Sequence, residues 1–150
     1  MPRSAMGDAS LPGLSLIVFS GQYERVHYAL VLAAAAAAID RPVTLFFTGE
    51  ALNALRPTAA TGAPGWHALA GSGEQSAAAL DARNASLGVA TLQDLLTACG
   101  QIGVRFLVCE MGLRAAELTT ADLRTDLAPE CAGVVTLLAE AGSDRSLLFL

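Results

Sequence analysis

Residues 14–47, LSLIVFSGQYERVHYALVLAAAAAAIDRPVTLFF, contain the pattern that decides the fold. The apolar run at 14–20 lacks a clean alternation of polar and apolar residues, which is typical of a strand covered on both faces. Residues 23–39 then predict a helix that is apolar on nearly every side and therefore largely buried. Pro42 cannot continue that helix, and residues 43–47 predict a second buried strand. This succession indicates two parallel strands joined by a helix.

The rest of the chain continues the alternation of strands and helices. A helix is predicted over residues 87–102, where Thr91 can cap its first turn, and strands are predicted at 104–108 and 146–149. Shorter helices are expected at 50–55, 111–118 and 133–141, while 74–83 is either a helix or an extension of the preceding loop. The pattern predicts an α/β fold with a mainly parallel sheet, helices on both faces and right-handed crossovers.

Residues 56–73 interrupt this pattern with Pro57, Gly62, Pro64, Gly65, Gly71 and Gly73. Such a composition disfavours both helix and strand. Long loops within a compact domain are usually functional or mobile. We therefore expect this segment to be the least ordered internal part of the chain.

The length and composition indicate one globular domain. The chain has 150 residues, of which 53% are hydrophobic and 15% charged, which excludes a disordered chain. Residues 1–12 are expected to form a flexible N-terminus and residues 13–150 a single domain. An apolar chain with so few charges is also expected to cover part of its surface by forming a homo-oligomer.

The charge balance and the apolar runs exclude several functions. Nine arginines, no lysine and fourteen acidic residues give a net charge of -5, which disfavours binding to nucleic acid or to an anionic membrane surface. The uncharged run at 26–39 is shorter than the roughly 20 residues of a spanning helix, and residues 1–12 contain no apolar signal region. We expect a soluble, cytoplasmic protein without membrane insertion.

Three cysteines carry the clearest chemical signal. Their odd number and spacing match neither a disulfide framework nor a zinc site, and we expect no metal and no cofactor. Cys109 directly follows a predicted strand and precedes a predicted helix, whose free N–H groups favour a thiolate. Arg114 could add positive charge, whereas Glu110 opposes ionisation. On the residues alone, a reactive thiol and an inert buried one remain open.

The other two cysteines have plainer interpretations. Cys99 lies on the apolar face of its predicted helix with Leu95 and Leu96, which indicates a core thiol. Cys131 lies near a turn, where it is either an ordinary thiol or one that resolves an intermediate on Cys109. The prediction is that Cys109 is the reactive thiol of the three.

Function in parallel sheets is found at the carboxyl ends of the strands. Here those ends are Ser20-Gly21, Thr48-Gly49, Cys109-Glu110 and the turn near residues 131–133. The turn at Ser20 and Gly21 could present backbone N–H groups to an anion or could be an ordinary strand-to-helix turn.

Several of these segments together resemble the DsrE-like family of sulfur-relay proteins. They are the Ser-Gly turn and Ala-rich helix beginning SGQYERVHYAL at 20–30, VTLFFT at 43–48, ALNAL at 51–55, the strand-then-Cys segment at 104–111, and Gly133-Val134 followed by Leu137. The resemblance covers most of residues 14–149 and omits the Gly/Pro-rich segment, which is longer than the connection typical of the family.

The resemblance implies a three-layer α/β/α fold with a mainly parallel five-stranded sheet, often assembled into oligomers. It implies that Cys109 accepts sulfane sulfur as a persulfide and passes it to an acceptor thiol, with sulfur-donor and sulfur-acceptor proteins as partners. Ser20, Gly21, Thr48 and Gly49 would bind the substrate if the strand order places them beside Cys109. If the relay is catalytic, the reaction class is that of a sulfurtransferase.

Two other functions stay open. The chain could be a non-catalytic module that binds a nucleotide or another anion at the Ser20-Gly21 turn, with Cys109 incidental. It could also be an interaction subunit whose role is assembly alone. Sulfur loading that depends on Cys109 would distinguish the carrier from both alternatives.

Overall fold

The computed structural model of the chain describes residues 11–142 and 144–150. Of the segment 1–12 that was predicted to be flexible, residues 1–10 lie outside the described residues. The main-chain oxygen of Pro12 accepts a hydrogen bond from Arg41 Nε at 2.7 Å. The elements in chain order are β1 (Gly13–Val18), α2 (Tyr23–Ala38), β2 (Val43–Phe47), η1 (Gly49–Leu55), η2 (Gly65–Ala68), α3 (Ala77–Ser86), α4 (Leu92–Ile102), β3 (Arg105–Cys109), α5 (Glu110–Ala115), η3 (Thr120–Asp122), β4 (Glu130–Ala132), α6 (Val134–Ala141) and β5 (Arg145–Phe149).

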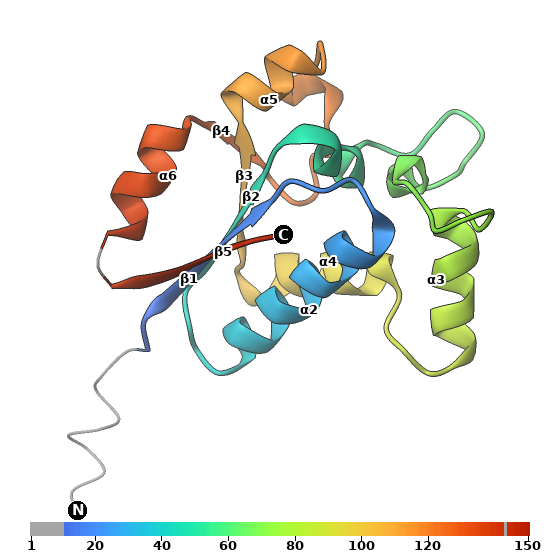
Figure 1. Ribbon diagram of the computed structural model, residues 1–150, viewed down its shortest axis with the longest axis horizontal. Helices are drawn as coiled ribbons and strands as arrows, with labels where there is room; N and C mark the ends of the chain where they lie inside the picture. The colour runs from blue at the N-terminus through green and yellow to red at the C-terminus, as the bar shows by residue number, and fades with distance from the viewer. Residues whose placement is uncertain (1–10, 143) are drawn as a thin grey trace, which may run out of the picture.

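The described strands form one five-stranded sheet in the order β4-β3-β2-β1-β5, and every neighbouring pair is parallel. This confirms the predicted α/β class and the mainly parallel five-stranded sheet. Helices α2 and α4 lie on one side of the sheet and α6 on the other, while α5 lies beyond the carboxyl end of β3 (Figure 1). No helix among the described residues is long and apolar enough to cross a bilayer.

Side chains on the two faces of the sheet form separate apolar clusters. The larger cluster joins β1, β2 and β3 to α2 and α4, and includes Leu16, Leu45 and Phe106. The smaller cluster lies under α6 and consists of Phe46, Leu107, Cys109 and Leu137. Strand residues alternate between the two clusters because successive side chains point to opposite faces.

Helix α2 begins and ends close to where the sequence predicts, whereas α4 begins at Leu92, five residues after the predicted start, and ends as predicted at Ile102. The side chain of Thr91 accepts a hydrogen bond from Asp94 N at 3.1 Å, so the predicted cap of α4 is confirmed. Gly103 ends α4 in the left-handed conformation at φ 90°, which an L side chain rarely adopts. The predicted helix at 50–55 is the 3-10 helix η1.

The structure corrects the expectation for residues 56–73. This segment contains η2, and it places Trp66 and Leu69 in the larger core cluster. Its backbone also pairs with the start of α2, where Ala70 N donates to Gly21 O and Tyr23 N donates to Ala70 O, both at 2.8 Å. The prolines and glycines permit tight turns, but the inward side chains and the main-chain bonds hold the segment against the domain.

A buried polar network joins α2, α3 and α4. Tyr23 donates to Asp81 Oδ1 at 2.5 Å, Leu92 N donates to the same oxygen at 2.7 Å, and Asn84 Nδ2 donates to the Tyr23 hydroxyl at 3.1 Å. Burial, together with the hydrogen bond to Asp81, raises the pKa of Tyr23, so this phenol stays protonated. The carboxylate thus satisfies two donors that would otherwise be buried without partners.

Replacing Asp81→Ala is expected to lower the free energy of unfolding by about 2–4 kcal/mol, because it leaves the Tyr23 hydroxyl and the Leu92 amide without their acceptor. Chemical denaturation measures the change. The exposed Glu74→Ala is the matched control and should change stability by no more than about 0.5 kcal/mol. Equal effects of the two substitutions would contradict the structural role of Asp81.

Candidate functional site

Cys109 is the last residue of β3 and the N-cap residue of α5. Its side chain is 4% exposed and contacts the smaller core cluster. The sulfur accepts a hydrogen bond from Gly112 N at 3.4 Å, since the first amides of a helix lack partners within the helix. The thiol is therefore held at the carboxyl edge of the sheet by both packing and a main-chain donor.

A cavity of about 350 Å³ gives access to Cys109. Its walls come from α5 and from the start of α6, and the lining residues are Cys109, Glu110, Met111, Arg114, Gly133, Val134 and Val135. Met111 and Val135 stand at 72% and 81% exposure, so apolar side chains surround the opening. The cavity can admit a small group to a sulfur atom that is otherwise covered.

The two charged side chains in this cavity pair with each other. Arg114 Nη2 lies 2.9 Å from Glu110 Oε1, one helical turn away, and both side chains are exposed. From the sequence, Arg114 was expected to favour ionisation of the Cys109 thiol and Glu110 to oppose it. In the structure the two side chains form an exposed ion pair, and such a pair contributes little net electric field at the thiol and little stability.

Thr48 and Gly49 lie against the start of α5. A Cβ built on Gly112 would stand 2.6 Å from Thr48 Oγ1, 3.3 Å from Cys109 Cβ and 3.4 Å from Gly49 N. Gly49 itself has φ +55°. Two of the predicted substrate-binding residues are thus close to the cysteine, although neither lines its cavity, and Gly49 lines a separate cavity of about 390 Å³ with Gly112.

Ser20 and Gly21 lie at the end of β1, which β2 separates from β3. Ser20 N donates to Leu150 O at 3.2 Å, Gln22 N donates to Ser20 Oγ at 3.2 Å, and Tyr23 N donates to Ala70 O. The structure does not bring Ser20 or Gly21 into the Cys109 cavity. Because these three amides bond within the protein, the turn offers them to no external anion.

Cys99 is fully buried in α4, as its position on the apolar helical face predicts. Its thiol donates to Leu30 O at a sulfur–oxygen distance of 3.7 Å. Burial raises the pKa of the Cys99 thiol to about 11. Cys99 is therefore a protonated core residue at neutral pH.

Cys131 is exposed in β4 and faces away from Cys109. The ladder pairs Val108 with Cys131 and Cys109 with Ala132, and directly paired residues of parallel strands share a face. The side chains of Cys109 and Cys131 therefore point to opposite faces of the sheet. This geometry does not support a resolving role for Cys131 toward Cys109.

The sequence placed the turn at 131–133 at this edge of the sheet but missed the wall that Val134 and Val135 of α6 add to the cavity. Gly133 is the N-cap residue of α6 and supplies no side-chain cap, and Val134 and Val135 of the first turn line the Cys109 cavity. A helix start without Ser, Thr, Asp or Asn, directly after a strand, is the signal that could have identified this wall.

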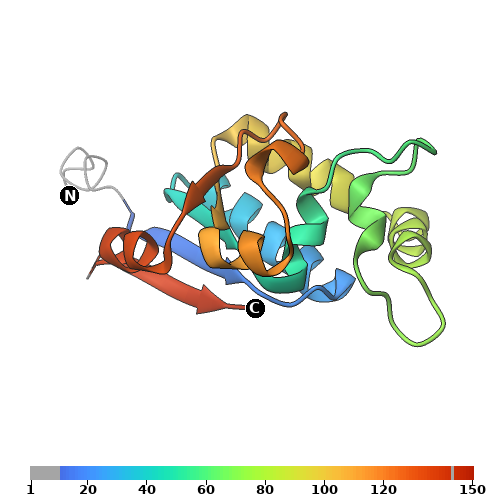
Figure 2. The same ribbon diagram turned by 90° about the horizontal axis from the view of Figure 1, so that it is seen from above.

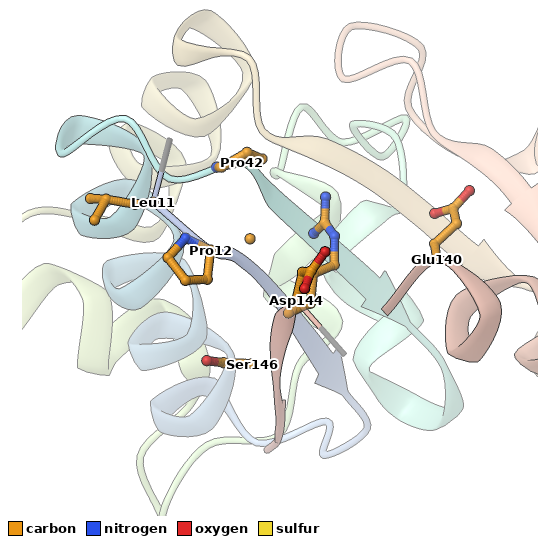
Figure 3. Close-up of a pocket in the computed structure, with 8 residues that line it drawn as sticks. Leu11, Pro12, Pro42, Glu140, Asp144 and Ser146 are labelled. Atoms are coloured by element: carbon orange, nitrogen blue, oxygen red, sulfur yellow. The ribbon is translucent and has the colours of Figure 1, made fainter. Parts of the chain in front are cut away.

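The two histidines lie elsewhere in the fold. The ring Nε2 of His27 lies 2.8 Å from Ala90 O, and His67 stacks edge-on against Trp66 with ring centroids 4.4 Å apart. Among the described residues, no group of three or more His, Cys, Asp or Glu side chains is arranged to hold a metal ion. A larger cavity of about 750 Å³ lies at the opposite, amino end of β1 and β5, beside Pro12, Glu140 and Ser146 (Figure 3). It is separate from the cysteine site.

Comparison with known proteins agrees with this architecture. The model of the DsrE/DsrF-like family matches residues 15–148, so the chain belongs to that family. No curated protein matches the sequence. The membership suggests sulfur relay at the level of the family.

Two solved structures share the fold. One is a protein of unknown function from Methanobacterium thermoautotrophicum, MTH1491, with 13% identity, a TM-score of 0.59, and coverage of 93% of this chain and 99% of that one. The other is the ychN protein from E. coli, with 16% identity, a TM-score of 0.54, and coverage of 92% and 99%. At these identities the likeness establishes the fold alone.

Gly112→Ala is expected to destabilise the protein by about 1–3 kcal/mol, because the new methyl group meets Thr48 Oγ1 at 2.6 Å. Combining it with Thr48→Ala removes that oxygen and should recover part of the loss. Chemical denaturation of the single and double variants measures the coupling. If the losses in the free energy of unfolding caused by Gly112→Ala and Thr48→Ala simply add in the double variant, the contact with Thr48 Oγ1 is not what destabilises Gly112→Ala.

The raised pKa of Cys99 predicts a loss of stability in alkaline solution. The stability that the folded state gains from a protonated Cys99 is fully present below the pKa of the thiol in the unfolded chain. It is lost as the pH rises through the pKa in the folded protein, about 11. The wild type should therefore lose up to about 2 kcal/mol more than Cys99→Ala over this range. Denaturation at a series of pH values tests this, and parallel curves for the two proteins would refute it.

Proposed function

We propose that the protein is a sulfur carrier in which Cys109 accepts sulfane sulfur as a persulfide and passes it to an acceptor thiol. The observation that carries the proposal is the position of Cys109 at the end of β3, inside a cavity, in a chain that belongs to the DsrE/DsrF-like family. Cys99 is buried and protonated, and Cys131 is exposed on the opposite face of the sheet. Cys99 and Cys131 are therefore poorer candidates than Cys109 for carrying the persulfide.

The loading step is a nucleophilic displacement at sulfur. The Cys109 thiolate attacks the outer sulfur of a donor persulfide, the new S–S bond forms as the donor S–S bond breaks, and the donor leaves as a thiolate. With thiosulfate as donor, the leaving group is sulfite. Neither reaction needs an external oxidant, because the transferred sulfur atom keeps its oxidation state.

The unloading step is the same displacement in the opposite direction. An acceptor thiolate attacks the terminal sulfur of the Cys109 persulfide, and Cys109 leaves as a thiolate. The Gly112 amide, which donates to Cys109 Sγ, is placed to stabilise negative charge on that atom in this step. The apolar walls from Met111, Val134 and Val135 limit water around the persulfide.

Other residues have supporting roles in this proposal. Thr48 and Gly49 position α5 by their contact with Gly112, and so position the amide that faces the sulfur. They act as positioning residues rather than as direct substrate ligands. Ser20 and Gly21 have no part in the cavity, which weakens the alternative of an anion-binding module at that turn.

The test is intact-protein mass spectrometry after incubation with thiosulfate or polysulfide. The wild type and Cys131→Ser should each gain the mass of one sulfur atom, whereas Cys109→Ser should gain none, because it lacks the attacking thiolate. Dithiothreitol should reverse the gain. This step distinguishes a persulfide from a sulfinic acid, which adds nearly the same mass and is not reduced by thiols.

The other outcomes separate the alternatives. Loading of Cys109→Ser at the wild-type level, or loss of loading in Cys131→Ser alone, would refute the assignment to Cys109. If no variant loads but a small anion raises the thermal stability of wild type and Cys109→Ser equally, the protein is a binding module. If neither effect occurs in a well-formed oligomer, an interaction subunit is favoured.

A further inference from the structure

The cavity over Cys109 has mainly apolar walls. Helices α5 and α6 lie on either side of β4 (Figure 2), and Met111 of α5 faces the cavity together with Val134 and Val135 of α6. These three side chains are exposed, Val134 to 44%, whereas the cysteine itself is buried. A group that reaches the sulfur through this cavity therefore lies against apolar side chains that are otherwise in contact with water.

The charged groups of the cavity are already paired. Among the described residues that line it, Glu110 and Arg114 alone carry charge, and they bond to each other at 2.9 Å. An anion that draws Arg114 away from this pair leaves the carboxylate of Glu110 facing the same cavity. A charged ligand group thus gives up water there without gaining a free partner of opposite charge, which is unfavourable.

The volume of the cavity limits the size of its ligand. At about 350 Å³ it is at the small end of ligand pockets, which span roughly 300–1,000 Å³. A space of this size suits a short alkyl chain or a single ring next to the sulfur, rather than a tripeptide or a nucleotide. Size, paired charges and apolar walls therefore favour the same kind of molecule.

We propose that this cavity selects the sulfur donor, and that the donor is a small organic sulfane-sulfur compound whose leaving group carries an uncharged alkyl or aryl substituent. The inference rests on the proposed loading of Cys109 and adds the substrate class. The substituent packs against Met111, Val134 and Val135 while the outer sulfur of the donor meets the thiolate. Burial of this apolar surface favours such donors over charged ones.

An organic thiosulfonate, R–SO₂–S⁻, illustrates the reaction. The Cys109 thiolate attacks the outer sulfur, the bond between Cys109 Sγ and that sulfur forms, and the S–S bond of the donor breaks. The electron pair of the broken bond leaves with the sulfinate R–SO₂⁻, and Cys109 holds a persulfide. The equation balances without an oxidant or a reductant, and the substituent R never bonds to the protein.

The first test compares benzenethiosulfonate with methanethiosulfonate, two donors of equal charge that transfer the same sulfur atom. Intact-protein mass spectrometry measures the rate of loading at low donor concentration. The advantage of the phenyl donor over the methyl donor should be about tenfold larger for wild type than for the variant Met111→Gln/Val135→Thr, as expected when roughly two CH₂ groups leave water. Thiosulfate, a dianion without a carbon group, should load wild type more slowly than either.

The double variant replaces two apolar walls by polar side chains of nearly the same shape at exposed positions, so the fold is retained. Leu138→Gln is the matched control, because Leu138 is also exposed on α6 but does not line the cavity. It should keep the phenyl advantage of wild type. An equal phenyl advantage in wild type and the double variant would overturn the proposal, while loading of Cys109 would still support the sulfur carrier.

A second test does not depend on sulfur relay. S-alkyl methanethiosulfonates, CH₃SO₂–S–R, transfer the group R–S to a thiol, and R can be benzyl, 2-sulfonatoethyl or 2-(trimethylammonium)ethyl. Peptide mapping of the unmodified protein gives the rates at Cys109 and at the exposed Cys131, which is an internal reference in the same molecule. The preference for benzyl over both charged groups should be at least about tenfold greater at Cys109 than at Cys131.

The two tests separate the failure of the proposal from the failure of the sulfur carrier. Equal preferences at the two cysteines, faster reaction of Cys109 with a charged reagent, or no reaction of Cys109 with any of the three reagents would overturn the selection of apolar groups. If no donor loads sulfur but the benzyl preference at Cys109 is found, the sulfur carrier is refuted, and the cavity is supported as a site for small apolar molecules.

Discussion

The hydrogen-bonded ladder between β2 and β3 determines where the chemical groups of this protein lie. Its register aligns Phe46 with Leu107 and Phe47 with Val108, so both strands end at the same level. The next residues, Thr48 and Cys109, are consequently neighbours at the carboxyl edge. Gly112 completes the arrangement, because its missing side chain lets α5 approach Thr48 while its amide faces the cysteine sulfur. A shift of one residue in this register would turn the cysteine to the other face of the sheet.

The two faces of the sheet are covered unequally. The sixteen-residue α2 and the eleven-residue α4 cover one face, and the eight-residue α6 covers part of the other. A parallel sheet is normally buried on both faces, and the strands here are correspondingly apolar. The thinner cover has two effects: it leaves an opening between α5 and α6 that reaches Cys109, and it leaves apolar side chains of β5 in contact with solvent. The same feature therefore underlies both the cavity and the exposed edge.

Local patterns in the sequence predicted most of the architecture. The strand at 43–47, the helix beginning at Tyr23 and the cap at Thr91 depend on neighbouring residues, and the structure confirms them. Trp66 and Leu69 were missed because their burial depends on pairing between Ala70 and residues some fifty positions earlier, which a Gly/Pro-rich composition does not reveal. The orientation of Cys131 was missed because it requires the register of a three-residue strand. The sequence identified Cys109 as the candidate thiol, but the cavity wall from Val134 and Val135 depends on how α6 crosses the sheet.

The pairing of β1 with β5 has a consequence for how the protein folds. Strand β1 is the first of the five strands in the chain, and its neighbour β5 is the last, separated by more than a hundred residues. During synthesis the nascent chain can pair β1 with β2 early, but the other side of β1 stays unpaired until β5 has been made. Contacts of such long sequence separation slow folding and leave an unpaired apolar edge exposed to aggregation in the meantime. Because β1 has an unpaired side until β5 is made, the partly synthesised chain exposes an apolar sheet edge that the folded domain covers.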